Sequence, residues 1–79
     1  MSKNWTKDGD EWVRIPAYQV EVGDTLIFLS AVEWEPHSYG KVIDIVKNSP
    51  YLSLRYKWPY EDTVYVLFTV EIADVNVLS

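Results

Sequence analysis

The strictest alternation in the chain is the stretch Leu52-Ser53-Leu54-Arg55-Tyr56-Lys57-Trp58. Successive side chains of a β-strand point to opposite faces, so the four apolar residues of this stretch share one face and the three polar residues share the other. Pro59 ends the pattern, because proline has no N–H group to donate to a neighbouring strand. The stretch therefore predicts a half-buried strand over residues 52–58.

The segments on both sides of this strand have the same character. Before it, Gly40 opens an apolar strand over residues 41–46, and residues 47–50 have the composition of a turn. After it, Glu61 and Asp62 indicate a second turn, and residues 63–72 alternate again. The apolar members of that alternation share one side and are Val64, Val66, Phe68, Val70 and Ile72. Residues 75–78 are expected to add a short last strand.

The first half of the chain predicts two more strands. Residues 11–15 alternate and stop at Pro16, which is typical of a strand at the edge of a sheet. In residues 20–29, Gly23 and Asp24 supply a tight turn between an alternating run and an apolar run. We expect the apolar run to be central and covered on both faces. Residues 30–39 predict a polar loop, and residues 1–9 are expected to fray.

The whole pattern predicts an all-β domain. Over residues 1–79 no segment places apolar residues at helical spacing through three turns, although a single helical turn in a connection fits the pattern. Seventy-nine residues suffice for one domain. A sheet this small leaves its edges and one face unprotected unless it closes or folds over. We therefore predict a single, partly open, five- to six-stranded antiparallel barrel.

The order of these features resembles the SH3-like small barrels. The resemblance rests on Val22-Gly23-Asp24, Gly40-Lys41-Val42 and the hairpin that follows, and it covers residues 20–58. It implies an SH3-like barrel in which these two tripeptides open the second and third strands. It also implies that the long loop and its neighbouring aromatic residues form a ligand groove containing Trp34, Tyr39 and Trp58.

Composition narrows the function classes. The net charge of -5 disfavours unspecific attraction to nucleic acid or to anionic lipid. The chain has no cysteine, which excludes disulfides, thiolate metal sites and a cysteine nucleophile. The first residues lack the apolar run of a secretory signal, and the apolar stretches are too short to span a bilayer. We expect a cytoplasmic protein without a membrane partner.

The sequence offers little to catalysis or to a metal. Glu33-x-Glu35-x-His37 places two carboxylates and an imidazole on one side of an extended segment, but Pro36 disturbs that geometry and the chain has no second histidine. Asp8-Gly9-Asp10-Glu11 begins like a calcium loop, yet Gln19 stands where the loop needs its last glutamate. His37 is the one side chain suited to a neutral-pH base. We expect no enzyme, no metal and no cofactor.

Aromatic residues near loop ends favour a binding role instead. Four Trp and six Tyr exceed what a core this small accommodates, so several rings are expected to reach the surface. Trp34 either covers the open end of the barrel or faces a partner. Exposed rings of this kind anchor protein interfaces. The predicted contacts to a protein partner are Trp34, Tyr39, Trp58, Tyr60, Glu33 and Glu35.

Three hypotheses of function follow from these residues. The first is a protein-binding module or inhibitor, and its small acidic, Tyr- and Trp-rich character suggests a phage-type accessory protein. The second is a nucleic-acid-binding barrel that uses Lys41, Arg55 and Lys57, with Tyr56 stacking on bases. The third is a structural subunit of a homo-oligomer that pairs the edge strands containing Trp12 or Val75.

Overall fold

The computed structural model describes residues 4–5, 11–28 and 38–78. These residues form seven antiparallel strands and one short 3-10 helix. The elements are β1 (Asn4–Trp5), β2 (Glu11–Pro16), η1 (Ala17–Gln19), β3 (Thr25–Phe28), β4 (Ser38–Asn48), β5 (Tyr51–Lys57), β6 (Tyr65–Val70) and β7 (Asp74–Leu78). The all-β prediction is confirmed.

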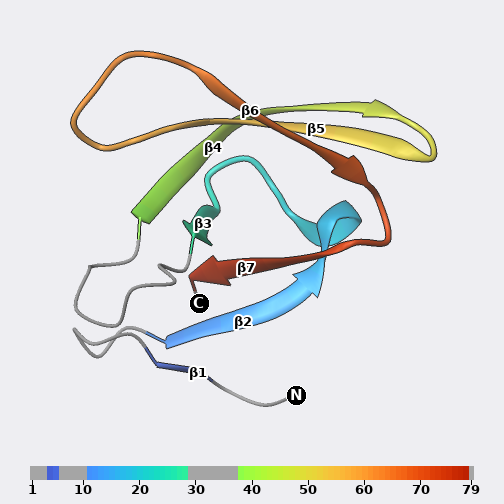
Figure 1. Cartoon of the computed structure of the whole chain (residues 1–79), viewed down its shortest axis with the longest axis horizontal. Coiled ribbons are helices and arrows are strands. Elements are labelled where there is room, and N and C mark those ends of the chain that lie inside the picture. The colour runs from blue at the N-terminus through green and yellow to red at the C-terminus, as the bar shows by residue number, and fades with distance from the viewer. Residues whose placement is uncertain (1–3, 6–10, 29–37, 79) are drawn as a thin grey trace.

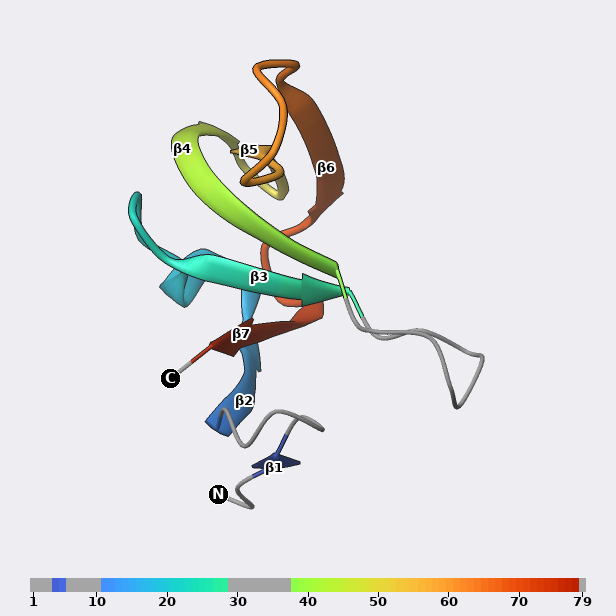
Figure 2. The same ribbon diagram turned by 90° about the vertical axis from the view of Figure 1, so that its left-hand side faces the viewer.

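One sheet contains all seven strands in the order β1-β2-β7-β3-β4-β5-β6. Its two ends, β1 and β6, do not pair with each other, so the described sheet is not closed. Figure 1 shows β4, β5 and β6 on one side of the molecule, β2 and β7 on the other, and β3 between them. In Figure 2 the two sets of strands cross at a steep angle, so the sheet folds over its own core.

Strand β4 connects the two halves of the sheet, because its two ends pair with different strands. Its first residues pair with β3, through Leu26↔Gly40 among others, and from Lys41 onward it pairs with β5. The register with β5 shifts between Val42 and Asp44, which is the mark of a β-bulge. A bulge bends its strand and increases the local twist. The bend lets one long strand join both halves of the sheet.

The core lies between the two halves. Leu52 and Leu54 of β5 are completely or almost completely buried, as are Leu26 of β3 and Val42 of β4. Ala17 of η1 is fully buried in the same cluster. Its backbone N–H donates to the carbonyl of Ala73 at 2.8 Å. The predicted inner face of residues 52–58 is therefore confirmed, and so is the helical turn allowed in a connection.

The central position predicted for the apolar run after Gly23 is also confirmed. Strand β3 lies between β7 and β4. Its consecutive residues Leu26 and Ile27 point to opposite faces, and both are buried. The alternating run expected before it is wrong, because residues 20–22 form no strand. Instead the Asp24 N–H donates to the Glu21 carbonyl at 3.1 Å, and Gly23 adopts a φ of 101° that closes this turn.

Two further boundaries differ from the sequence-based prediction. Strand β4 begins at Ser38, so the end of the expected loop belongs to the sheet. Of the stretch expected to fray, Asn4–Trp5 forms β1 and pairs with the start of β2, and the rest of β2 has no described neighbour on that side. Residues 1–3, 6–10 and 29–37 lie outside the described residues.

The expected edge at Val75 is wrong. Strand β7 lies between β2 and β3 and pairs Val77 with both Val13 and Leu26, so it has neighbours on both sides. Trp12 is buried on β2, so this ring does not present an exposed edge. The edge that remains open through its whole length is β6, whose one described neighbour is β5.

Candidate binding groove beside β4 and β5

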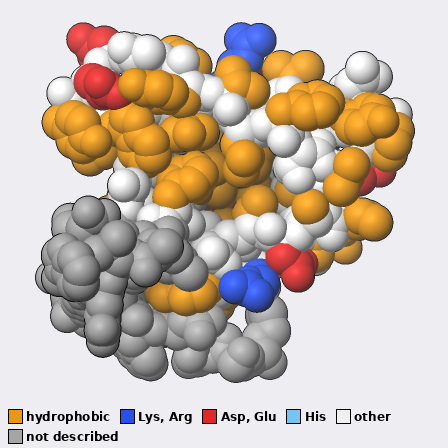
Figure 3. Space-filling view, viewed as in Figure 1, with side chains coloured by type: hydrophobic (Ala, Val, Ile, Leu, Met, Phe, Trp, Pro, Cys, Tyr) orange, Lys and Arg blue, Asp and Glu red, His pale blue; other side chains and the backbone are white. Residues whose placement is uncertain are grey.

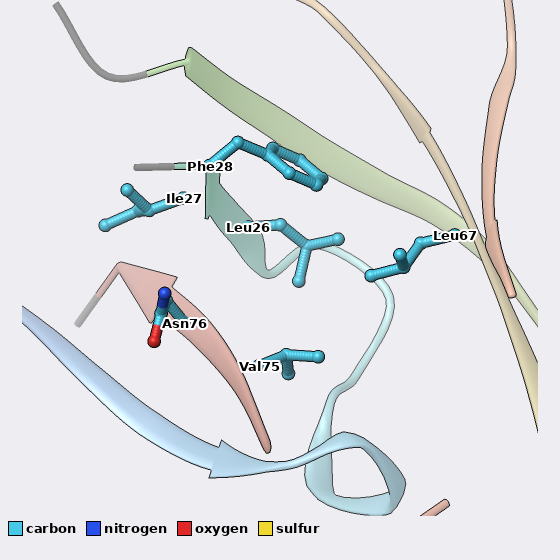
Figure 4. Close-up of a pocket in the computed structure, with 6 residues that line it drawn as sticks. All are labelled: Leu26, Ile27, Phe28, Leu67, Val75 and Asn76. Atoms are coloured by element: carbon cyan, nitrogen blue, oxygen red, sulfur yellow. The ribbon is translucent and has the colours of Figure 1, made fainter. Parts of the chain in front are cut away.

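Two hollows in the surface could receive a ligand. The first, of about 370 Å³, lies between the two halves of the sheet and is lined by Leu26, Ile27, Phe28, Leu67, Val75 and Asn76. Figure 4 shows Leu26, Phe28, Leu67 and Val75 pointing into the space between β3, β6 and β7. Its one polar lining residue, Asn76, already accepts a hydrogen bond from Arg14 Nε at 3.2 Å. None of the lining residues that the structure describes is titratable.

The second hollow is an open groove of about 330 Å³ on the outer side of β3, β4 and β5. Its lining residues are Thr25, Tyr39, Lys41, Ile43, Lys57, Trp58 and Pro59. The alternation of β4 explains three of them, because residues 39, 41 and 43 point to the same face of the strand. Pro59 ends β5 and turns the chain, which places Trp58 at one end of the groove. We call this hollow the aromatic groove.

Packing holds Trp58 in place from behind. Its ring lies 5.4 Å from the ring of Phe28, 5.2 Å from that of Tyr56 and 5.7 Å from that of Tyr65, measured between centroids. Edge-to-face and tilted arrangements at these distances are favourable for aromatic pairs. Trp58 is therefore half-buried in a ring cluster and still lines the groove, as a preorganised anchor does.

The floor of the groove has a positive charge. Lys41 and Lys57 are directly opposite each other in the β4–β5 ladder, and like charges at such positions repel. Among the described residues, neither ammonium group has a carboxylate within salt-bridge distance. Arg55 differs, because it faces Asp44 at 3.9 Å. An anionic group bound between the two lysines would relieve their repulsion.

Tyr65 and Tyr56 are the two described groups with shifted acidity, and neither indicates catalysis. The Tyr65 hydroxyl donates to Glu61 Oε1 at 2.5 Å, and this hydrogen bond raises the pKa of Tyr65 above 10.0. Burial raises the pKa of Tyr56. Both tyrosines therefore stay protonated at neutral pH.

The structure brings together only part of the predicted partner contacts. Tyr39 and Trp58 line the same groove, whereas Tyr60 is 78% exposed beyond Pro59 and does not line it. Trp34, Glu33 and Glu35 lie outside the described residues, as does His37 of the candidate metal motif. The described residues contain no cluster of three His, Asp or Glu side chains that could hold a metal ion.

Sequence reasoning missed the charge of the groove. It assigned Lys41 and Lys57 to a nucleic-acid face and the acids to the protein-binding face, but the structure places both lysines beside Tyr39 and Trp58. The available signal was the register: with a bulge between residues 42 and 44, Lys41 falls opposite Lys57. The stacking role expected of Tyr56 is wrong, because its ring is buried in the core.

Comparison with family models, with curated proteins and with solved structures finds no match to this chain. The geometry of the groove therefore carries the functional argument alone. Within the described ranges, no helix is long and apolar enough to cross a membrane.

Proposed function

We propose that the protein is a non-enzymatic interaction module, or a small inhibitor, that binds a protein partner through the aromatic groove. The observation that carries this proposal is that Tyr39, Trp58 and Pro59 line one open groove together with two unpaired lysines. Aromatic rings on a rigid sheet provide large contact area with little loss of side-chain entropy, which is why such rings anchor interfaces.

The chemistry of the groove defines what the partner presents. Its rings and Ile43 favour an apolar or aromatic side chain, while Lys41 and Lys57 favour a carboxylate beside that side chain. We therefore propose that the ligand is a segment of protein with an apolar residue flanked by Asp or Glu. Trp34, Glu33 and Glu35 stay in the proposal as further contacts from the segment before β4.

The proposal keeps the likeness to SH3-like barrels. In those domains the ligand groove is formed by the long loop and its neighbouring aromatic residues. Here Tyr39 follows the long connection between β3 and β4, and Trp58 follows β5, so the groove has the corresponding place along the chain. A phage-type accessory role and a cytoplasmic location remain parts of the same proposal.

Nucleic acid is the alternative ligand for the same lysines. The buried ring of Tyr56 argues against the stacking expected for it, and Arg55 lies 3.9 Å from Asp44, whose negative charge disfavours a phosphate there. Backbone contacts of lysines to phosphates weaken steeply with salt, whereas an interface anchored by rings keeps most of its affinity. Salt dependence therefore distinguishes the two ligands.

The test is affinity capture from lysate with matched variants. The tagged protein is presented to nuclease-treated lysate of the source cell, and bound protein is eluted with rising salt. We expect one protein that is retained by the wild type, lost with Tyr39→Ala and with the double variant K41E/K57E, and retained by Tyr18→Ala. Tyr18 is a half-exposed ring on η1, away from the groove, and is the matched control.

Two further variants extend this test. Trp34→Ala asks whether the undescribed segment contributes, and Trp58→Phe keeps the ring cluster filled while it shortens the groove wall. Equal capture by wild type, Tyr39→Ala and K41E/K57E would refute the groove as the binding site. Loss of all capture on nuclease treatment would favour the nucleic-acid alternative.

A further inference from the structure

The open edge of β6 exposes unpaired backbone groups, and the ladder with β5 shows which ones. The Glu71 N–H donates to the Pro50 carbonyl at 2.9 Å, and these two residues are opposite each other in the register that pairs Val70 with Tyr51. Hydrogen-bonded and non-hydrogen-bonded pairs alternate along an antiparallel ladder. Residues 65, 67 and 69 therefore point their N–H and C=O groups toward β5, and residues 66, 68 and 70 point theirs away from it.

The same three residues expose apolar side chains. Val66 is 55% exposed, Phe68 is 65% exposed and Val70 is also exposed, so the edge offers apolar side chains and free backbone groups together. Among the hydrogen bonds of the described residues, only the Val70 carbonyl has another partner, the N–H of Ala73 at 3.0 Å. Residues 64–70 contain no charge, no proline and no glycine, which are the usual protections of a sheet edge.

Neighbouring apolar residues enlarge this surface. Tyr51 stacks on Phe68 with centroids 5.5 Å apart, and Ile72 is 77% exposed. Figure 3 shows hydrophobic side chains over much of the region where Figure 1 draws β6. We call this surface the β6 patch; it consists of Tyr51, Val64, Val66, Phe68, Val70 and Ile72.

The area of the β6 patch is that of one side of a small dimer interface. At about 150 to 250 Å² for each full side chain, the exposed fractions give about 600 Å² of apolar surface, against about 800 Å² per partner in a standard interface. The main chain of the edge and its flanking residues add to the apolar area. When two β6 strands pair edge to edge, the outer-face side chains of the two copies lie side by side on one continuous sheet, so each copy covers part of the other's patch.

We propose that the β6 patch binds a second copy of this chain, with the two β6 strands antiparallel across a two-fold axis. Such an axis places the same surface on both partners, so each outward N–H meets an outward C=O of the other copy. Only residues 66, 68 and 70 have outward groups, so they must pair among themselves. The axis therefore passes through Leu67, Phe68 or Thr69.

Local charge at this surface does not oppose a second copy of the chain. Two copies with a net charge of -5 each repel, but the strands that meet here are uncharged. Dimerisation should therefore strengthen with added salt, which screens the remaining repulsion. This inference is independent of the aromatic groove, whose ring-anchored ligand is not expected to bind more tightly as salt is added.

The first experiment is sedimentation equilibrium of the full chain over a concentration series. We expect a monomer–dimer equilibrium whose dissociation constant falls as salt is added and rises at least tenfold with Phe68→Lys and with Val66→Lys. Val22→Lys adds the same charge at another exposed valine, in the turn before β3, and should leave the dissociation constant unchanged. The unfolding midpoint of each diluted variant shows that it is folded.

The second experiment detects the backbone pairing itself. Amide hydrogen exchange should slow with rising concentration at Phe68 and Val66, whose N–H groups point outward, and stay constant at Leu67 and Thr69, which already donate to β5. A chain that stays monomeric at the concentrations used for NMR would overturn the proposal. So would open-ended assembly, a dimer that Val22→Lys weakens as much as Phe68→Lys, or a dimer without the predicted slowing.

Discussion

Strands β5 and β6 are neighbours with the same alternating pattern, yet they use it in opposite ways. The apolar side chains of β5, at residues 52, 54 and 56, are buried, whereas those of β6, at residues 66, 68 and 70, are exposed. The register explains the difference. Leu54 is opposite Leu67, and Ser53 is opposite Phe68, so the apolar residues of the two strands lie on different faces of the sheet.

This contrast teaches that alternation defines a strand without defining its inner face. Directly opposed residues share a face, and the inner face of β6 is formed by Tyr65, Leu67 and Thr69. Two of these three side chains are polar or amphipathic. An exposed apolar strand face is typical of an interaction surface, and the partner of such a surface need not belong to the same chain.

The largest effect that separates the two strands is expected from Leu54→Ala. Leu54 is fully buried at the centre of the core, so the substitution removes buried area and leaves a cavity, which costs about 2–5 kcal/mol of the free energy of unfolding. Urea denaturation followed by tryptophan fluorescence measures this loss. A loss below that of a half-buried, outer-face β5 variant such as Ser53→Ala would show that the inner face is wrongly assigned.

Gly40→Ala tests how tightly β5 packs on β4. A Cβ atom at residue 40 would lie 2.5 Å from Cδ2 of Tyr56, whose ring also packs against Phe28 at 5.1 Å between centroids. The ring has little room to move, so we expect a loss of about 1–3 kcal/mol by overpacking. Thermal unfolding measures it.

Gly23 provides the control for this substitution. No atom lies within 4 Å of a Cβ built there, so Gly23→Ala reports only the cost of a φ of 101°. If Gly40→Ala costs as much stability in a Tyr56→Ala background as in the wild type, steric contact with the Tyr56 ring is not the cause of the loss.

How much of this the sequence predicts depends on the range of the interaction. The local alternation of residues 52–58 predicts β5 and its inner face nearly to the residue, and Gly23 predicts a turn. The position of β7 between β2 and β3 gives no local signal in the sequence, because the pairing of Val77 with Leu26 joins residues that are far apart in the chain. The edge expected at Val75 was wrong for this reason.

The aromatic groove shows the same division. Tyr39 and Trp58 could be predicted as binding residues because each lies where a strand meets a connection. Their lysine neighbours could not, since the bulge in β4 that places Lys41 opposite Lys57 depends on tertiary packing. The buried position of Tyr56 follows directly from the alternation of β5, which excludes the base-stacking role once the inner face is known.

Unfolding at alkaline pH tests the burial of Tyr56, because the tyrosine hydroxyl ionises there. Burial raises the pKa of Tyr56 above its ordinary value of 10.0, because the ionised form is less well solvated in the folded chain. The unfolded chain thus loses its proton first. The stability contributed by protonated Tyr56 is fully present below pH 10 and is lost as the pH rises through the folded-state pKa.

Tyr56→Phe should therefore flatten the fall of the unfolding free energy above pH 10. Tyr65→Phe is the matched variant, since the hydrogen bond to Glu61 raises the pKa of Tyr65 and gives the same sign. The unfolding free energy of each variant is measured by urea denaturation from pH 8 to pH 11. An alkaline slope identical in wild type and both variants would mean that neither ring resists ionisation.

The smallest effect is expected from Phe68→Ala, the counterpart of Leu54→Ala on the neighbouring strand. Phe68 is mostly exposed and stacks only on Tyr51, diagonally across the ladder, so its loss should cost less than about 1 kcal/mol in dilute solution. Urea denaturation at two protein concentrations makes the comparison decisive. If β6 binds β6 of a second copy, the wild type gains more stability with concentration than Phe68→Ala does, because only in the dimer does the ring gain a neighbour from the other copy. A large loss at the lower concentration would instead mean that Phe68 supports the monomer, and the contrast between the two strands would fail.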